Sequence, residues 1–239
     1  MSTANTEWTV RPHGPLEEID SGILAVVGEG TVPSMDLPRR MTVVRLRDGR
    51  LVIWSPVSLD NAGMATLESY GRPAFLVVPS AHHRLGAPAW KMRFPALQVV
   101  TPPGSRTSVG DVVSVDSTAP DFGDSQIQFI VVPGTRDEEA ALLIRRRGGT
   151  TLVLDDLVDN VRHASGFGGW LLRRMGLAGD EPQVPTTVAS LVVKDKSALR
   201  AQLLRWAEIP DLKRIVVSHG DLIESNPRGV LRELASSLA

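Results

Sequence analysis

The sequence predicts one α/β domain in which mixed β-sheets are covered by helices. Three features of its 239 residues lead to this fold class. Apolar β-type runs alternate with helical periodicity in the first part, strands cluster in the middle, and helices with a single strand close the chain. No internal repeat, low-complexity segment or linker divides the sequence. We therefore expect a single domain over residues 1–239, with residues 1–20 forming a peripheral or poorly ordered stretch.

The first part of the chain contains a clear β-hairpin signal. Residues 41–46 are rich in β-branched side chains, Asp48-Gly49 favours a tight turn, and the apolar run 51–54 returns. Gly71 is expected to end a helix whose apolar residues recur at helical spacing. The expected strands are 22–27, 41–46, 51–54, 74–78 and 97–100, and the expected helices are 58–70 and 88–94.

The second part of the chain carries its own turn and helix signals. Gly148-Gly149 favours a hairpin, and Asn226 and Pro227 are the residue types preferred at the N-cap and first position of a helix. Gly166–Gly169 lacks the lysine and the context of a phosphate loop, so we interpret it as a flexible loop bordering the pocket. The expected strands are 111–115, 126–132, 140–146, 150–154 and 212–217, and the expected helices are 170–175, 196–206 and 227–238.

The composition narrows the classes of function. A net charge of −1 gives no bulk field for nucleic acid or an anionic membrane, so neither is expected as a partner. The chain has no cysteine, which excludes disulfides, thiolate chemistry and cysteine-ligated metals. No apolar run reaches the roughly 20 residues of a membrane helix, and the first residues do not resemble a secretory signal. We expect a cytoplasmic protein, and the abundance of Arg, Ala, Gly, Val and Pro suggests a bacterial source.

Three segments place metal-ligating side chains directly after apolar strands. They are Ser80-Ala81-His82-His83, Asp155-Asp156 and Ser218-His219-Gly220-Asp221. If the three strands share a sheet, their ends converge at one edge. Two or three imidazoles with a carboxylate form a common ligand set for zinc, iron or manganese. The plainer interpretation is that the histidines are ordinary loop histidines and that one of the two aspartates caps a turn.

The order of these segments resembles that of the metallo-β-lactamase-fold hydrolases. Further likeness lies in the run that begins Arg40-Met-Thr-Val-Val-Arg, in Trp54-Ser-Pro-Val and in Pro79-Ser-Ala-His-His, and it spans about Gly22 to Leu238. The resemblance implies an αββα sandwich. In that family the first motif reads His-x-His-x-Asp-His, and later turns supply a histidine, a bridging aspartate and a last histidine.

The resemblance is incomplete, and the ligands that are missing belong together. Val78 and Ser80 stand where the first motif has its leading histidines, and Thr135 stands where the second motif has its histidine. His82 takes the place of the motif's aspartate, and His83 takes the place of its final histidine. In the family the three missing histidines build one metal position, so the resemblance implies that this position is lost.

The ligands that remain belong to the other metal position of the family. Asp156 fits the bridging aspartate, with Asp155 in place of a glycine, and His219 fits the last histidine. The resemblance therefore implies a single-metal site of His82, His83, Asp156 and His219. The expected cofactor is one divalent metal ion, with zinc preferred over iron or manganese, or none if the site is inactive. Asp155 or Asp156 is the expected proton acceptor.

Two functions remain open on the sequence alone, with a redox role of bound iron as a weaker third. The first is a hydrolase with one metal ion that acts on a small ester, amide, lactone or thioester. The second is a catalytically inactive protein of the same fold that binds a ligand or a protein. The chain has no Gly-x-Ser-x-Gly elbow and no cysteine, which disfavours covalent hydrolysis. We expect His163 to lie on the solvated surface and Arg145–Arg147 to form a solvated hairpin tip. No role is assigned to His13, and the oligomeric state is left open.

Overall fold

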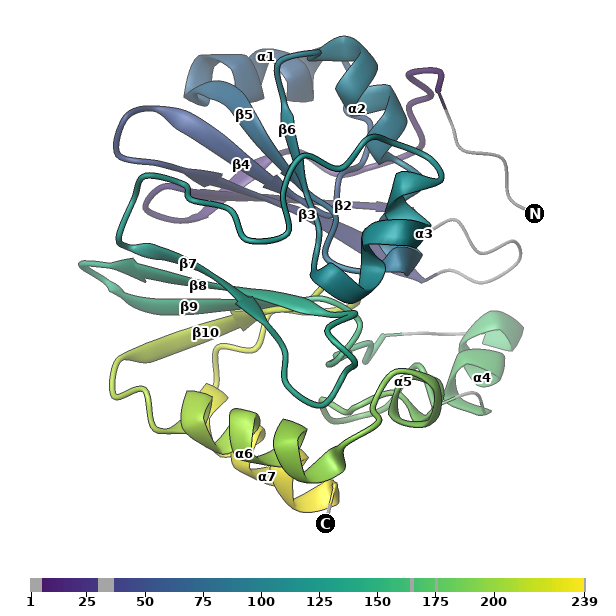
Figure 1. Ribbon diagram of the computed structural model, residues 1–239. Helices are drawn as coiled ribbons and strands as arrows, with labels where there is room; N and C mark the ends of the chain where they lie inside the picture. The colour runs from purple at the N-terminus through teal and green to yellow at the C-terminus, as the bar shows by residue number, and fades with distance from the viewer. Residues whose placement is uncertain (1–5, 30–36, 164–165, 175, 239) are drawn as a thin grey trace. The chain divides into compact units, whose positions relative to one another are not determined.

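Two mixed β-sheets organise the chain, and each belongs to its own compact unit (Figure 1). The computed structural model describes residues 6–29, 37–163, 166–174 and 176–238. The first unit comprises Met1–Glu29 and Arg40–Ser125, and the second comprises Gly30–Arg39 and Gln126–Ala239.

The first unit contains a six-stranded sheet with the order β1-β2-β3-β4-β5-β6, apart from the first two residues of β3, which belong to the second unit. The β3–β4 pair is the predicted hairpin and is antiparallel, whereas β4, β5 and β6 run parallel to one another. The strands are β1 (Glu17–Asp20), β2 (Ile23–Glu29), β3 (Pro38–Arg45), β4 (Arg50–Trp54), β5 (Arg72–Val77) and β6 (Gln98–Val100). The helices are α1 (Asn61–Tyr70), α2 (Ala87–Arg93), α3 (Arg106–Gly110) and two short 3₁₀ turns, Ala81–His83 and Pro103–Ser105.

The core of the first unit lies between this sheet and its helices. Leu67 of α1 and Trp90 of α2 pack in one cluster with Val43, Ile53 and Leu76 of the strands. Strands β3 and β4 are buried along most of their length, and the second half of β5 is buried as well, which is typical of strands whose apolar residues are not separated by polar ones. The predicted end of α1 is confirmed, because Gly71 follows its last residue and donates its N–H to the carbonyl of Leu67.

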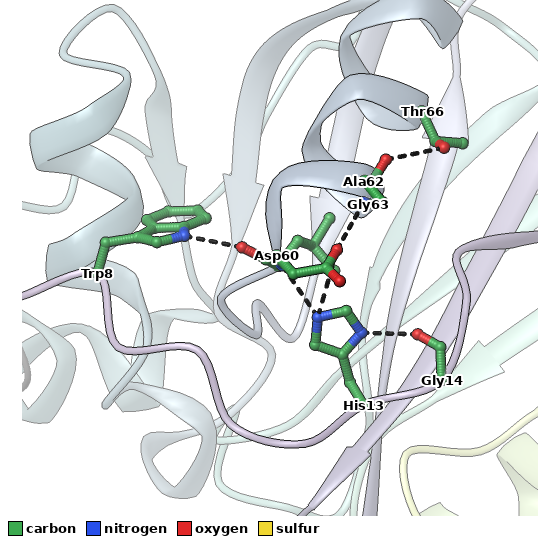
Figure 2. A network of polar contacts seen from close by, with 8 residues as sticks. Trp8, His13, Gly14, Asp60, Ala62, Gly63 and Thr66 are labelled. Atoms are coloured by element: carbon green, nitrogen blue, oxygen red, sulfur yellow. Dashed lines mark hydrogen bonds and ion pairs between the residues drawn. The ribbon is translucent and has the colours of Figure 1, made fainter.

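The segment before β1 is attached to the start of α1 (Figure 2). The backbone N–H of Asp60 donates to Nε2 of His13 at 3.0 Å, while Nδ1 of His13 donates to the carbonyl of Gly14 at 2.6 Å. The carboxylate of Asp60 caps α1 by accepting from the N–H of Gly63, and Trp8 donates its indole N–H to the carbonyl of Leu59. Both nitrogens of His13 therefore serve the structure of this segment.

The second unit contains a four-stranded sheet with the order β10-β9-β8-β7. β7, β8 and β9 are antiparallel neighbours, and β10 pairs with β9 in parallel. The strands are β7 (Ile127–Val131), β8 (Ala140–Arg146), β9 (Gly149–Leu154) and β10 (Leu212–Val216). The helices are α4 (Gly166–Arg174), α5 (Thr186–Leu191), α6 (Lys196–Ala207) and α7 (Pro227–Ser237).

Helices α6 and α7 pack against the four-stranded sheet and close the core of the second unit (Figure 1). Trp206 of α6 and Leu231 of α7 share one cluster with Leu152 of β9 and Ile215 of β10. Asn226 is the N-cap of α7, and its side chain accepts from the N–H of Gly229. This cap was predicted, and it is confirmed.

Two of the sequence-based expectations are wrong. Residues 111–115 form a turn after α3 rather than a strand, and Gly166–Gly169 is the first turn of α4 rather than a loop. The short elements β1, α3 and α5 were not predicted from the sequence. Across the described residues, none of the helices has the length and apolar character needed to cross a bilayer.

Candidate metal centre

The loops after β9 and β10 bring two aspartates and one histidine together in the second unit. Because these strands are parallel neighbours, their carboxyl ends lie at the same edge of the sheet. Asp155 and Asp156 follow β9, while Ser218 and His219 lie just beyond the end of β10. The hydroxyl of Ser218 donates to Oδ1 of Asp155 at 2.7 Å, and Asp155 is fully buried. The two predicted strand-end segments of this unit therefore meet.

The two ring nitrogens of His219 have different partners. Nδ1 lies 2.7 Å from the carbonyl oxygen of Pro38, and because a carbonyl can only accept, Nδ1 carries a hydrogen. In the neutral imidazole this leaves a lone pair on Nε2, which lies 3.1 Å from Oδ1 of Asp156. An imidazole lone pair and an ionised carboxylate are both acceptors, so this contact requires a proton or a cation.

The donor chemistry of this pair fits a divalent metal ion. Two ligand atoms bound tetrahedrally at about 2.0–2.1 Å lie a little over 3 Å apart, which matches the spacing of Nε2 and Oδ1. Metal-ligating histidines commonly donate their other N–H to a carbonyl or carboxylate, which fixes the tautomer and the direction of the lone pair. The carbonyl of Pro38 does this for His219. Asp156 and His219 can therefore hold a metal.

A tight turn holds His219 in place. Gly220 has φ of 94°, a left-handed conformation that favours glycine. The N–H of Asn160 donates to the carbonyl of His219 at 3.0 Å, and the N–H of Asp221 donates to the carbonyl of Asn160 at 2.9 Å. A Cβ atom on Gly220 would lie only 2.0 Å from that Asn160 carbonyl oxygen, so this turn has room for glycine alone.

A second group of carboxylates adjoins Asp156. Glu139, Asp155 and Asp156 each offer an oxygen, and these oxygens lie within 4.8 Å of one another. Burial raises the pKa of the Glu139 carboxyl well above its usual range, and the charges of Asp155, Asp156 and Glu138 raise it further. Burial also lowers the pKa of Arg39, whereas Asp155 and Asp156 act to raise it. Arg39 thus supplies a buried positive charge to these aspartates.

The adjacent histidines of the first unit differ in environment. Both lie in the 3₁₀ turn Ala81–His83, where His83 is buried and His82 is exposed. Nδ1 of His83 lies 2.6 Å from Oγ of Ser55, which directly follows β4. Ser55 is fully buried and has φ of 54°, a left-handed conformation that is uncommon for a residue with a side chain. The hydroxyl of Ser55 therefore orients the imidazole of His83.

The positions that lack the family's histidines have structural roles. Thr135 is fully buried, and its hydroxyl donates to the carbonyl of Val132 at 2.7 Å. Val78 belongs to the core of the first unit, and Ser80 is buried beside the turn of the two histidines.

His163 is 86% exposed and pairs with Asp221 at 3.3 Å, so its predicted surface position is confirmed.

Three residues that contribute to these surroundings were not predicted from the sequence: Ser55, Glu139 and Arg39. Glu139 belongs to the charged run Asp137-Glu138-Glu139, and such a run is typical of a solvated turn. Its position directly before the continuously apolar β8 was the available signal, since the neighbours of a fully buried strand are often buried as well. Arg39 similarly opens the apolar part of β3.

Comparison with solved structures identifies the fold. A metallo-β-lactamase from Erythrobacter litoralis superposes with a TM-score of 0.64 at 12% identity, covering 93% of this chain and 96% of that one. For the metallo-β-lactamase from Pontibacter korlensis the TM-score is 0.63 at 15% identity, with 92% and 98% covered. For FIM-1 from Pseudomonas aeruginosa in its mono-zinc form, the TM-score is 0.61 at 13% identity, with 94% and 96% covered.

The chain therefore has the metallo-β-lactamase fold, and the predicted α/β fold class is confirmed. At these identities the likeness concerns the fold. No protein-family model matches the sequence, and a search of curated proteins finds no match.

Proposed function

We propose that the protein is a metal-dependent hydrolase with a single divalent metal ion. Asp156 and His219 are the central proposed ligands. The observation that carries the proposal is the 3.1 Å contact between Nε2 of His219 and Oδ1 of Asp156, with Nδ1 bonded to the carbonyl of Pro38. The metallo-β-lactamase fold supports it, and one solved protein of that fold is a mono-zinc form.

His83 and His82 complete the proposed ligand set. His83 is supported by its burial and by the hydroxyl of Ser55, which can accept from Nδ1 and so leave the Nε2 lone pair for a metal. His82 is exposed, so we propose it as the weakest and most easily displaced ligand. A site with one loose ligand keeps a position open for water or substrate, as catalysis requires.

The proposed reaction is hydrolysis of an ester, amide, lactone or thioester in a small molecule. When bound, the metal would acidify a water molecule and polarise the substrate carbonyl. Asp156 is the proposed proton acceptor, because Asp155 is fully buried and already accepts the hydroxyl of Ser218. A set of imidazole and carboxylate donors suits zinc, with iron and manganese as alternatives.

Metal analysis of the full chain, purified without an affinity tag, tests the proposal. We expect about one equivalent of zinc, iron or manganese, lost in His219→Ala and in the double variant His83→Ala/His219→Ala. His163→Ala is the matched control, because that histidine is 86% exposed and should leave the metal content unchanged. Protein that holds no metal after incubation with zinc or manganese would contradict the proposal.

A second candidate is a catalytically inactive binding protein of this fold. The observation that favours it is Thr135, which stands where the resemblance expects a histidine ligand and whose buried hydroxyl is used in a hydrogen bond to the carbonyl of Val132. On this alternative, a panel of ester, lactone, amide and thioester substrates is not hydrolysed by metal-loaded protein, while a ligand still raises its melting temperature. Turnover that disappears in His219→Ala would exclude it.

A further inference from the structure

Three carboxylates of the second unit are buried together, and one oxygen of Glu139 among them has no hydrogen-bond partner. Glu139 is 1% exposed, Asp155 is 0% exposed and Asp156 is 9% exposed. Each contributes an oxygen to a set whose members lie within 4.8 Å of one another. Among the described residues, Oε2 of Glu139 has no hydrogen-bond partner. A buried carboxylate oxygen without a partner is costly, which points to something that the cluster binds.

The charges of the cluster leave room for a divalent cation. Carboxylates this close together repel one another when they are ionised, and Arg39 contributes one positive charge through its interaction with Asp155 and Asp156. A divalent cation bound by the three oxygens would offset the repulsion among them. Ser218 also supports Asp155, because its hydroxyl bonds to Oδ1 and holds this carboxylate in one orientation.

We propose that Glu139, Asp155 and Asp156 form a cation position of their own, adjacent to the imidazole of His219 and sharing Asp156 with it. Its ligands are all oxygens, which select hard divalent ions over zinc. Carboxylate oxygens suit magnesium, calcium and manganese(II), and manganese(II) is the probe chosen here because its paramagnetism allows the free ion to be followed directly. The position requires no histidine, and it stands whether or not the protein is a hydrolase.

Manganese binding to full-length protein stripped with a chelator tests this position. The comparison is made in the His219→Ala background, so that the imidazole contributes nothing. Free manganese is followed by electron paramagnetic resonance, and the melting temperature is followed in parallel. We expect one manganese in His219→Ala, and at least tenfold weaker binding once Glu139→Gln is added. Glu138→Gln is the matched control, since Glu138 is the adjacent but less buried carboxylate and acts on Glu139 only through its charge, so it should weaken binding far less than Glu139→Gln does.

Each outcome bears on the cation position alone. Equal manganese affinity with and without Glu139→Gln overturns it. Absence of binding in His219→Ala also overturns it, and means that a proton on Glu139 balances the cluster instead. Binding that depends on Glu139 in a protein that takes up no zinc at His219 supports it while the hydrolase proposal fails. If His219→Ala does not unfold cooperatively, the two glutamate variants are compared in the otherwise unaltered chain saturated with zinc, with the same criteria.

Discussion

His219 shows how a single backbone contact determines what a side chain can do. The carbonyl of Pro38 accepts from Nδ1, so in the neutral imidazole the other nitrogen faces Asp156 with its lone pair. A histidine with the opposite tautomer would present an N–H to the same carboxylate and would exclude a cation. The chemistry of this position thus depends on a residue 181 positions earlier in the chain.

Ser55 is predicted to stabilise the first unit through His83 at a cost in backbone strain. Ser55→Ala removes the partner at 2.6 Å and should lower the free energy of unfolding by about 1–2 kcal/mol. Ser55→Gly removes the same bond but relieves the left-handed strain at φ of 54°, so it should be less harmful by about 1 kcal/mol. Urea denaturation of both variants measures this difference, and an alanine variant at least as stable as the glycine variant would contradict it.

Glu139 is predicted to make the protein less stable as the pH rises. Because burial raises its pKa in the folded state, the folded chain holds this proton more tightly than the unfolded chain does. The resulting stabilisation is complete below the unfolded pKa of about 4.3 and disappears as the pH rises through the folded pKa. In metal-free buffer with a chelator, Glu139→Gln should therefore gain stability relative to wild type between pH 4 and pH 8. A difference between the two proteins that is independent of pH would refute this.

At the residue scale, the strand-end motifs singled out two side chains that meet in the structure, while their role as metal ligands stays a prediction. Asp156 and His219 were selected by strand-end position and by the family resemblance, and the structure brings their side chains together. The roles of Ser55, Glu139 and Arg39 could not be predicted from the sequence, because each depends on burial by segments distant in sequence. Alternation patterns report which face of a strand is apolar, but they do not report which polar side chain is enclosed with it.

At the scale of elements, the turn after β10 is predicted to be intolerant of substitution. Gly220→Ala places a Cβ atom 2.0 Å from the carbonyl oxygen of Asn160 and forces φ of 94° on alanine. We expect a loss of at least about 2 kcal/mol in unfolding free energy, together with weaker zinc binding at His219. Thermal denaturation and zinc titration measure the two effects. An alanine variant with unchanged stability would mean that the turn can move without disturbing the sheet.

The N-cap of α7 gives a second prediction at this scale. Asn226→Ala removes the side chain that accepts from Gly229 and should cost about 1–2 kcal/mol, because alanine is also unfavourable at φ of 51°. Asn226→Asp is the matched control, since an aspartate keeps the accepting oxygen, and it should retain most of the stability. Guanidinium unfolding curves of the two variants measure this difference, and an alanine variant as stable as the aspartate variant would contradict the capping role.

The errors at the element scale have physical causes. The run Asp111–Val115 resembles a strand because three of its residues are valines. In the structure, Val109 and Val113 lie four residues apart, as on one face of a helix, and both are buried in the core of the first unit. The N–H of Val113 donates to the carbonyl of Val109, so helical hydrogen bonding continues past α3. In α4, burial of Leu172 against Leu37 and Val161 offsets the low helix propensity of its glycines.

For the whole molecule, metal binding is predicted to raise thermal stability. Zinc at 100 times its dissociation constant should add about 2.7 kcal/mol, or roughly 5–10 °C in melting temperature for a chain of this size. His219→Ala should abolish the shift and His163→Ala should preserve it. Differential scanning calorimetry with and without a chelator measures both. A shift of equal size in His219→Ala would mean that zinc binds elsewhere.

The fold as a whole was more predictable than its details. The order of strands, turns and ligand-bearing loops in the sequence led to the metallo-β-lactamase fold, and solved proteins of that fold superpose over most of the chain at 12–15% identity. Apolar periodicity and turn residues survive extensive substitution, because many side chains satisfy them. The division into two units with separate cores was not predicted, since no linker or change of composition marks it.

The buried environment of Thr135 restricts which side chains this position can accept. Its hydroxyl is bonded to Val132 in a space with no solvent exposure, so a bulkier imidazole introduced by Thr135→His would crowd the interior and break that bond. The same holds for a histidine at Val78 in the other core. Thr135→His and Val78→His should therefore each lower the free energy of unfolding, so a histidine at either position would cost folding stability before it could contribute a ligand.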